Sequence, residues 1–353
     1  MPDSDPFALV SGEPPRLSET TARHVARTRY GLDVEVSTLV SERDQNFRMT
    51  ATDGLEYVLK IANAAEPVEV MDFQIEALIH IAKRISDRDI PIRVPQVVSA
   101  LDGASSIEID SARGRHRARM VTFLPGSPLG ARIPSPALAR NMGRFLAHLG
   151  WALRGFSHPG SKQSLIWDLQ QAPRLRELVP CIRDTEVARA VNETLDDFER
   201  YAAPLLPSLR AQVIHSDMHA DNVLVGAADD NRPVGIIDFG DMLLAPLIAD
   251  VAIAASYLDP ASGDPFNLIA EFVAGYHEVT PLAAEETGIL FELIKTRCCT
   301  TLCMQEWRLS MRGPDDPYLG TYGNDGSSAG CFLCQLMDIP RDSARQQFRQ
   351  ITG

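Results

Sequence analysis

The sequence predicts an α+β protein of two lobes, the first rich in strands and the second mainly helical. At 353 residues, the chain is longer than a single hydrophobic core usually reaches. Alternating apolar residues indicate strands mainly before residue 124, and apolar residues three and four apart indicate helices mainly after it. Proline and glycine interrupt both patterns in TFLPGSP, at Thr122–Pro128. We therefore place one lobe in residues 1–124 and the other in residues 125–353.

The overall charge excludes some classes of partner. Its net value is −13, which argues against binding to nucleic acid or to an anionic membrane. The first twenty residues have neither the basic nor the apolar region of a signal peptide. The most apolar helix-like stretch, Leu247–Leu258, is too short to span a bilayer and carries Asp250. We expect a cytoplasmic protein with no nucleic-acid or membrane partner.

The cysteines are few for this length and predict no disulfide framework. Three of them cluster at 298–303 in a helical run, without the spacing of metal ligands, and Cys331 and Cys334 form a C-x-x-C pair. A zinc site is the alternative, but we expect buried free thiols.

The elements of the first lobe follow from local signals. Ser18 is typical of a helix cap, and Gly31 of the position just after a helix. Alternating residues on both sides of Asp53-Gly54 predict a hairpin with a two-residue turn. After Pro67 we expect an amphipathic helix with one apolar face made of Ile75, Leu78, Ile79 and Ala82. Further strands are expected around 95–100, 106–109 and 117–124.

The second lobe is predicted to begin with a helix capped by Ser135, with Pro136 at its first position. A second helical region covers about 185–203, and helices return from Pro246 to about Arg312. Between them we expect short strands at 213–214, 223–225 and 234–237, with a turn at Asp229–Asn231.

Two short motifs carry the chemistry. His215-Ser216-Asp217 is followed after four residues by Asn222, and Asp238-Phe239-Gly240 follows one strand later. Phosphoryl transfer needs one carboxylate facing the attacking hydroxyl, and an Asn and a second Asp that hold magnesium ions. H-x-D-x-x-x-x-N followed by D-F-G supplies these groups in that order. Each residue alone is explained as well by a turn, but the whole set between strands favours a kinase.

The first lobe offers an independent test of this reading. A kinase needs a strand lysine for the α- and β-phosphates, held by a glutamate of the next helix. Lys60 in YVLKIA and Glu76 stand in these positions. The alternative is a solvated strand lysine and a surface glutamate, which is the usual state of such residues.

The order of these motifs from about residue 30 to 310 resembles the aminoglycoside-phosphotransferase and choline-kinase superfamily, which has the protein-kinase-like fold. Three strings resemble hydroxylysine-kinase-like proteins more narrowly: SERDQNF (Ser41–Phe47), WDL (Trp167–Leu169) and IDFGDM (Ile237–Met242).

The resemblance implies a role for each site residue. Asp217 becomes the catalytic base, Asn222 and Asp238 the metal ligands, and Lys60 with Glu76 the phosphate-binding ion pair. The loop from Ser41 to Asn46 would cover the nucleotide phosphates, although it contains no glycine. Thr122 and Leu124 would meet the nucleobase at the hinge.

Two departures from protein kinases favour a small-molecule acceptor over a protein substrate. Ser216 stands where protein kinases have an arginine that reads a phosphorylated activation loop. Pro246 and a helical run follow almost directly after D-F-G, which leaves no segment to hold a peptide.

Each of the remaining candidate site residues has two interpretations. Asp241 faces a substrate ammonium group or, as we prefer, bonds within its turn. Trp167 and Asp168 line the acceptor site, or are a buried tryptophan and a capping aspartate. Trp307 borders the pocket or packs in the core of its helix. We expect Asp250 and His215 to brace the catalytic loop.

We also expect the segment 313–330 to be a mobile loop near the pocket.

The sequence thus predicts transfer of the γ-phosphoryl of ATP, or of GTP, to an alcohol of a small amine-bearing metabolite, with Mg²⁺ required. The resemblance favours hydroxylysine or another amino alcohol as acceptor, with aminoglycosides as the alternative. A nucleotide-binding scaffold without turnover is a hypothesis of another class, which the intact Asp217, Asn222, Asp238 and Lys60 oppose. A metal-dependent hydrolase would leave Lys60 and Glu76 unexplained.

Overall fold

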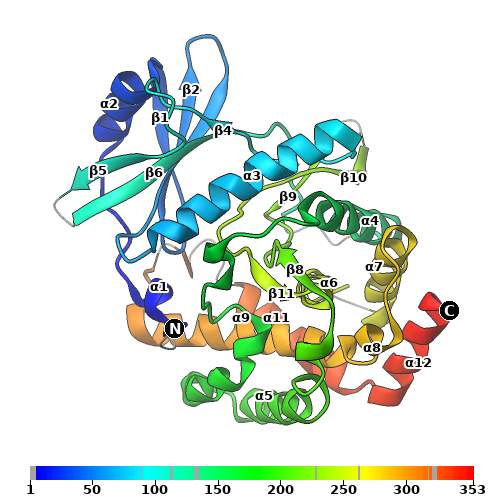
Figure 1. Cartoon of the computed structure of the whole chain (residues 1–353). Helices are drawn as coiled ribbons and strands as arrows, with labels where there is room; N and C mark the ends of the chain where they lie inside the picture. The colour runs from blue at the N-terminus through cyan, green and yellow to red at the C-terminus, as the bar shows by residue number, and fades with distance from the viewer. Residues whose placement is uncertain are drawn as a thin grey trace.

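A computed structural model describes residues 5–88, 90–111, 114–130, 135–226, 229–260, 263–316, 318–319 and 324–353. A strand-rich part made by the N-terminal third of the chain lies against a larger helical part (Figure 1). The α+β class predicted from the sequence is confirmed.

The N-terminal part is an antiparallel sheet with helices beside it. Its elements are α1 (Ala8–Ser11), α2 (Glu19–Tyr30), β1 (Val34–Leu39), β2 (Gln45–Ala51), β3 (Glu56–Ile61), α3 (Val68–Arg88), β4 (Val97–Val98), β5 (Ile107–Ser111) and β6 (Gly114–Thr122). Among the described residues the strand order is β1-β2-β3-β6-β4, with β5 also paired to β6. This order puts β3, which carries Lys60, in the middle of the sheet.

Apolar alternation on β2 and β3 sets the register of the sheet. Phe47 lies opposite Leu59, and both are fully buried together with Met49 and Ile61 in a core that α2 covers. The connecting turn is longer than predicted, because residues 52–55 all lie between the strands. Gly54 alone supplies a positive φ there, of 83°.

The helix signals of this part are only partly confirmed. Ser18 Oγ accepts a hydrogen bond from the Thr21 amide, and Gly31 ends α2 with a φ of 70°, as predicted. On α3 the predicted face is wrong at Ile79, which is 51% exposed. Phe73, Ala77 and Ile81, four residues apart, form the fully buried stripe instead.

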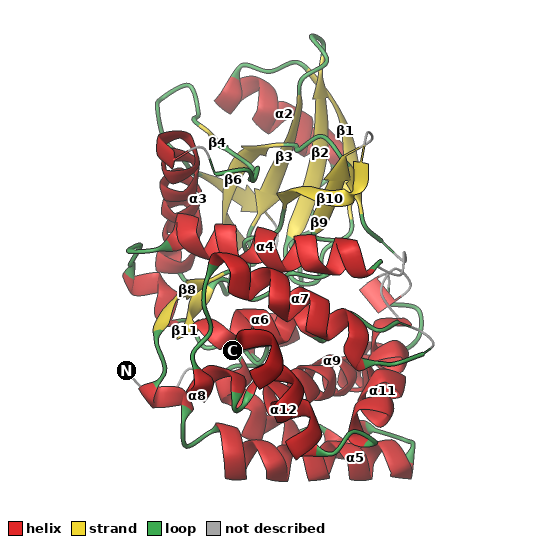
Figure 2. Cartoon of the chain, turned by 90° about the vertical axis from the view of Figure 1, so that its right-hand side faces the viewer, coloured by secondary structure: helices red, strands yellow, loops and turns green. Residues whose placement is uncertain are grey.

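The C-terminal part is built of helices around two small sheets. Its elements are β7 (Ser127–Pro128), α4 (Pro136–Leu153), η1 (Pro159–Lys162), η2 (Leu169–Glu177), η3 (Val179–Cys181), α5 (Thr185–Asp197), η4 (Phe198–Ala202), η5 (Leu206–Ser208), β8 (Ala211–Ile214), β9 (Val223–Gly226), β10 (Asp229–Ile236), β11 (Leu243–Pro246), α6 (Leu247–Ala255), α7 (Phe266–Val279), α8 (Ala284–Thr287), α9 (Leu290–Arg312), α11 (Asn324–Met337) and α12 (Arg341–Thr352). Figure 2 shows α4 and the helices that follow it below the large sheet of the N-terminal part, with β8 and β11 among them.

Strand pairing in the C-terminal part frames the two motif loops. β8 pairs with β11 and β9 pairs with β10, both antiparallel. The turn predicted at Asp229–Asn231 falls inside β10, so that prediction is wrong. The helix at Ser135 is as predicted, since its Oγ accepts from the Leu138 amide.

One large hydrophobic core runs through both parts of the chain. It includes Phe73 of α3 and Leu9 of α1 together with the interior of α4, α7 and α9. The ring of Phe7 lies 6.0 Å from that of Trp307, and Arg312 donates to the Gly12 carbonyl. Residues 7–12 therefore pack against α9 (Figure 1).

The cysteine prediction is right for α9 and wrong for α11. Cys298, Cys299 and Cys303 are buried, and burial raises the pKa of each thiol. Cys331 and Cys334 are exposed, whereas Phe332 and Leu333 on the same helix are buried. Within the described ranges no three His, Cys, Asp or Glu side chains are placed to hold a metal. None of the described helices is both long and apolar enough to cross a membrane.

Candidate active site

Asp250 and His215 hold the loop that carries Asp217 in place, as predicted. The amides of His215 and Ser216 donate to the two carboxylate oxygens of Asp250, at 3.3 and 2.8 Å. His215 Nε2 lies 3.1 Å from the carbonyl of Ile237, next to D-F-G. Ser216 has a φ of 66°, a conformation that side chains other than glycine adopt only when their surroundings enforce it.

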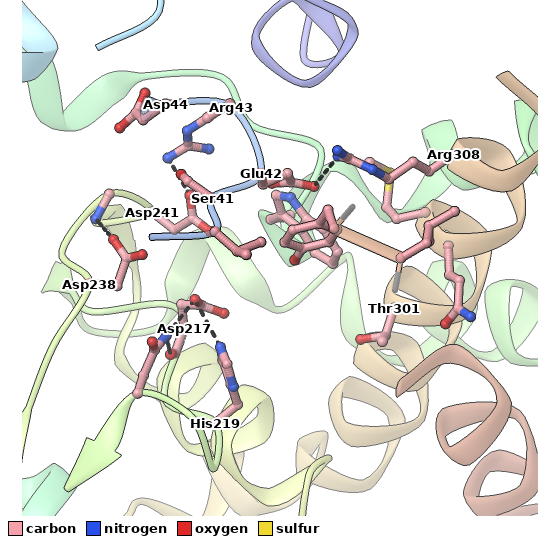
Figure 3. Close-up of a pocket in the computed structure, with 18 of the residues that line it drawn as sticks. Ser41, Glu42, Arg43, Asp44, Asp217, His219, Asp238, Asp241, Thr301 and Arg308 are labelled. Atoms are coloured by element: carbon pink, nitrogen blue, oxygen red, sulfur yellow. Dashed lines mark hydrogen bonds and ion pairs between the residues drawn. The ribbon is translucent and has the colours of Figure 1, made fainter. Parts of the chain in front are cut away.

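Asp217 is surrounded by groups that favour its charged form. Asn222 Nδ2 donates to Asp217 Oδ2 at 2.8 Å, and His219 Nε2 lies 3.5 Å from the same oxygen (Figure 3). Arg297 Nη2 lies 3.3 Å from the other oxygen, Oδ1. Burial by itself would raise the pKa of Asp217, but His219 and then Arg297 hold it below its usual value. The carboxylate is therefore deprotonated at neutral pH and able to accept a proton.

Arg297 is a site residue that the motif analysis missed. It lies in the middle of α9 with 1% of its surface exposed. Its guanidinium donates to the Trp167 carbonyl at 3.1 Å and to the Tyr257 hydroxyl at 3.2 Å, and stacks 4.8 Å from the Trp167 ring. A charged residue at a core position of a helix requires a partner. An arginine at such a position was the one signal in the sequence that could have identified this site residue.

Lys60 and Asp238 form an ion pair between the two parts of the chain. Lys60 Nζ lies 2.9 Å from Asp238 Oδ1, which also accepts from the Gly240 amide. Burial alone would raise the pKa of Asp238, but Lys60 and Arg43 hold it well below its usual value. Like Ser216, Asp238 has a left-handed backbone, with a φ of 58°.

The predicted pair of Lys60 with Glu76 is wrong for this structure. The Glu76 side chain is 60% exposed, and its nearest ion partner is His158 at 3.9 Å. Gln74 takes the inward position on α3 instead, where its amide donates to the Gly240 carbonyl at 3.3 Å. Residues 74 and 76 are two apart, and such residues point to different sides of a helix.

Asn222 and Asp238 fit the requirements of a hard cation. Asn222 uses Nδ2 for Asp217, which leaves its amide oxygen for a ligand. Asp238 binds Lys60 and Gly240 through Oδ1, and no donor is bonded to its Oδ2 among the described residues. Both side chains line one cavity beside Asp217. Oxygen donors of this kind suit Mg²⁺.

The loop between β1 and β2 reaches into the same cavity. Ser41 lines it, as do Glu42, Arg43 and Asp44. Arg43 Nη2 lies 2.6 Å from Asp241 Oδ1, so Asp241 faces a protein cation (Figure 3). The structure therefore gives Asp241 a partner that neither of the two interpretations anticipated.

The remaining predicted nucleotide residues lie outside the described lining of this cavity. Asn46 is inside β2, opposite Lys60, and is 8% exposed. Thr122 ends β6 and accepts a hydrogen bond from the Gln96 amide. Leu124 packs against Gly235 of β10, where the chain crosses to the C-terminal part.

The cavity has a volume of about 140 Å³, and its other end is formed by α9 and the residues that follow it. Thr301, Gln305 and Arg308 line this end with Tyr318. Arg308 stacks on the Tyr318 ring at 4.5 Å, and its Nη1 lies 3.6 Å from Glu42 Oε1. Burial raises the pKa of Glu42 to about 7. Part of the 313–330 segment thus lines the cavity, whereas residues 317 and 320–323 lie outside the described residues.

The other predicted acceptor residues separate into two groups. Trp167 lines the cavity. Asp168 caps η2 by accepting from the Gln170 amide at 3.0 Å, and burial raises its pKa to about 6. Trp307 packs against Phe7 and is not among the described residues that line the cavity, which agrees with the alternative of packing in the core.

The model of the phosphotransferase enzyme family matches residues 35–286. The chain belongs to this family. A hydroxylysine kinase from Danio rerio is 27% identical over 355 residues, covering 96% of this chain and 98% of that protein. This phosphotransferase is therefore a small-molecule kinase that transfers a phosphoryl group to a hydroxyl.

Two solved structures show the same fold. The microcompartment-associated aminopropanol kinase has a TM-score of 0.70 and 17% identity, and the match covers 90% of this chain and 95% of that chain. An amicoumacin kinase in complex with AMP-PNP and Ca²⁺ has a TM-score of 0.66 and 14% identity, and the match covers 91% of this chain and 94% of that chain.

Proposed function

We propose that this kinase transfers the γ-phosphoryl of ATP or GTP, with Mg²⁺, to a hydroxyl of a small amine-bearing metabolite, and that the acceptor is an amino alcohol of the hydroxylysine kind. The observation that carries the proposal is the position of Asp217. Its deprotonated carboxylate faces a cavity that Lys60, Asn222 and Asp238 also line. The similarity to hydroxylysine kinase over almost the whole chain supports the acceptor class.

In this proposal Asp217 orients the acceptor hydroxyl and takes its proton as the bond to phosphorus forms. Asn222 and Arg297 occupy one carboxylate oxygen each, so the base is held in one orientation. Holding the reacting groups in line contributes much of the rate of such a transfer.

Asn222 and Asp238 would hold Mg²⁺, which supplies neutralisation of the charge on the transferred group. Lys60 would contact the phosphates from β3, since its ammonium already lies 2.9 Å from Asp238. We further propose that the nucleotide lies between residues 1–124 and residues 125–353, with Ser41 over its phosphates and Thr122 and Leu124 beside its base.

The far end of the cavity supports a zwitterionic acceptor. Glu42 and Arg308 place an acidic and a basic group side by side there, both largely buried, and Arg308 also donates to Asp316 at 3.3 Å. An acceptor with an ammonium and a carboxylate can pair with both groups, whereas a polycationic aminoglycoside finds a partner only for its amines.

The test is nucleotide turnover with ATP and GTP, with Mg²⁺, against a panel of amino alcohols, hydroxy-amino acids and aminoglycosides. We expect release of nucleoside diphosphate that depends on a hydroxy-amino acid or an amino alcohol. Turnover only with aminoglycosides would replace the acceptor class. Nucleotide binding without turnover on the whole panel would favour the hypothesis of a nucleotide-binding scaffold. Nucleotide hydrolysis that is independent of any acceptor would favour a metal-dependent hydrolase.

A further inference from the structure

The loop between β1 and β2 lacks the glycines by which many kinases bring backbone amides close to the nucleotide phosphates. Its residues 40–44 read Val-Ser-Glu-Arg-Asp. Contacts between this loop and a phosphate must therefore come from side chains or from an ordinary backbone. Arg43 is the one cation in this stretch.

Arg43 is buried at the rim of the phosphate-binding groups. It is 7% exposed and lines the same cavity as Lys60 and Asp238. Its main-chain carbonyl accepts from Asn63 Nδ2 at 3.3 Å, which fixes the backbone of the loop. Its charge is also one of the groups that hold the pKa of Asp238 low.

Among the described residues, only one of the two terminal nitrogens of the Arg43 guanidinium has a partner. Nη2 pairs with Asp241 at 2.6 Å, whereas Nη1 is buried and has no hydrogen-bond partner among the described residues. A buried donor without a partner is costly and calls for an explanation. Because the Arg43 side chain lines the cavity, a ligand that binds beside Lys60 and Asp238 can supply the missing partner.

We propose that Arg43 is a ligand of the nucleotide β- and γ-phosphates. Its free Nη1 receives the phosphate oxygens, while Asp241 holds the guanidinium from the other side. A planar guanidinium suits this task, because it can bind two oxygens at once and stays charged at every relevant pH. With Lys60 it supplies two cations beside Asp238, in the role that glycine-rich loops fill with amides. The proposal rests on the proposed function, since it requires that the cavity bind a nucleotide.

The experiment is calorimetric titration of the whole chain with ATP, ADP, AMP and adenosine, in the presence of Mg²⁺. For Arg43→Gln we expect affinity for ATP and ADP to fall at least about tenfold, and affinity for adenosine to stay unchanged. The control is Arg29→Gln, which removes an exposed arginine of α2 that pairs with Asp102 outside the described lining of the cavity. It should bind all four ligands like the wild type.

Arg43→Gln leaves Asp241 buried without its partner, which can destabilise the fold. A second variant therefore separates loss of folding from loss of phosphate binding. The double variant Arg43→Gln/Asp241→Asn removes both charges together and should show the same selective loss for ATP and ADP. Equal affinities in wild type and variants, or an equal loss for adenosine and ATP, would overturn the role of Arg43. A wild type that binds no nucleotide would instead overturn the proposed function itself.

Discussion

At the scale of single residues, the site is a carboxylate base held by neighbours in its own loop and by one cation from a distant helix. Asp217 accepts from Asn222 in its own loop and from Arg297 on α9, eighty positions away. The separation explains why motif spacing predicted the first contact and could not predict the second. Motifs report groups that act within one loop, whereas a partner from another helix depends on how the helices pack.

Arg297 acts through Asp217, so its loss should alter the pH profile of the reaction. Because its charge lowers the pKa of Asp217, Arg297→Met should move the acid limb of kcat/KM to higher pH and reduce kcat by roughly 10²-fold. Arg297→Lys should restore part of the profile. The measurement is the pH dependence of turnover.

Lys295→Met is a matched control, since Lys295 is also buried on α9 but pairs with Asp197, outside the described lining of the cavity. It should change stability and leave the pH profile in place. An unshifted acid limb in Arg297→Met would show that this arginine does not act on the base.

Asp250 should make stability depend on pH. Burial raises its pKa to about 6, above the value near 4 of an unfolded aspartate, so the folded chain binds the extra proton in between. The contribution of protonated Asp250 to the free energy of unfolding is complete below pH 4 and is lost as pH rises through 6. Relative to Asp250→Asn, which cannot ionise, the wild type should lose roughly 2–3 kcal/mol over this interval. Urea unfolding of both proteins at several pH values measures the difference, and parallel curves would contradict the assignment.

At the scale of elements, the helices were predictable but their partners were not. Periodicity and the Ser135 cap predict α4, yet nothing local indicates that it packs on α7. The contact depends on glycines: a Cβ on Gly143 would lie 2.0 Å from the Phe272 carbonyl oxygen, and one on Gly275 would lie 1.9 Å from that of Arg140. The two helices approach so closely because neither has a side chain at the crossing.

Gly143→Ala or Gly275→Ala should therefore destabilise the protein by about 1–3 kcal/mol or more, because the new methyl group overlaps the backbone of the facing helix. Gly150→Ala is the control on the same helix, since its Cβ would meet nothing nearer than 3.5 Å. It should be neutral or slightly stabilising. Thermal or urea unfolding measures the change in stability of each variant. Equal losses of stability in Gly143→Ala and Gly150→Ala would contradict the close approach of α4 and α7.

The failure at Glu76 belongs to the same scale. The sequence pattern correctly placed an acidic residue in the helix after β3, but the side chain that faces D-F-G depends on how α3 is rotated on the sheet. Gln74 faces inward, and Glu76 faces outward. A rotation of this kind is decided by the whole apolar stripe of the helix, which includes Phe73 and Ala77.

At the scale of the whole molecule, ion pairs connect the sheet of the N-terminal part to the catalytic loops and α9. Lys60 meets Asp238, Arg43 meets Asp241, and Glu42 meets Arg308. The catalytic motifs singled out Lys60 and Asp238 for phosphate and metal binding, but they did not predict that the two residues pair with each other. The other two pairs could not be predicted, since the resemblance of SERDQNF names no partners for its residues, and the partners lie 198 and 266 positions further along the chain.

The most direct test of the account is turnover by Asp217→Asn beside the wild type, with nucleotide affinity measured on both proteins. The variant keeps the size of the side chain and removes the proton acceptor. We expect acceptor-dependent release of nucleoside diphosphate to fall by about 10²–10⁴-fold, while nucleotide affinity changes little. Turnover equal to that of the wild type would contradict the assignment of Asp217 as the base, and with it the mechanism proposed for this kinase.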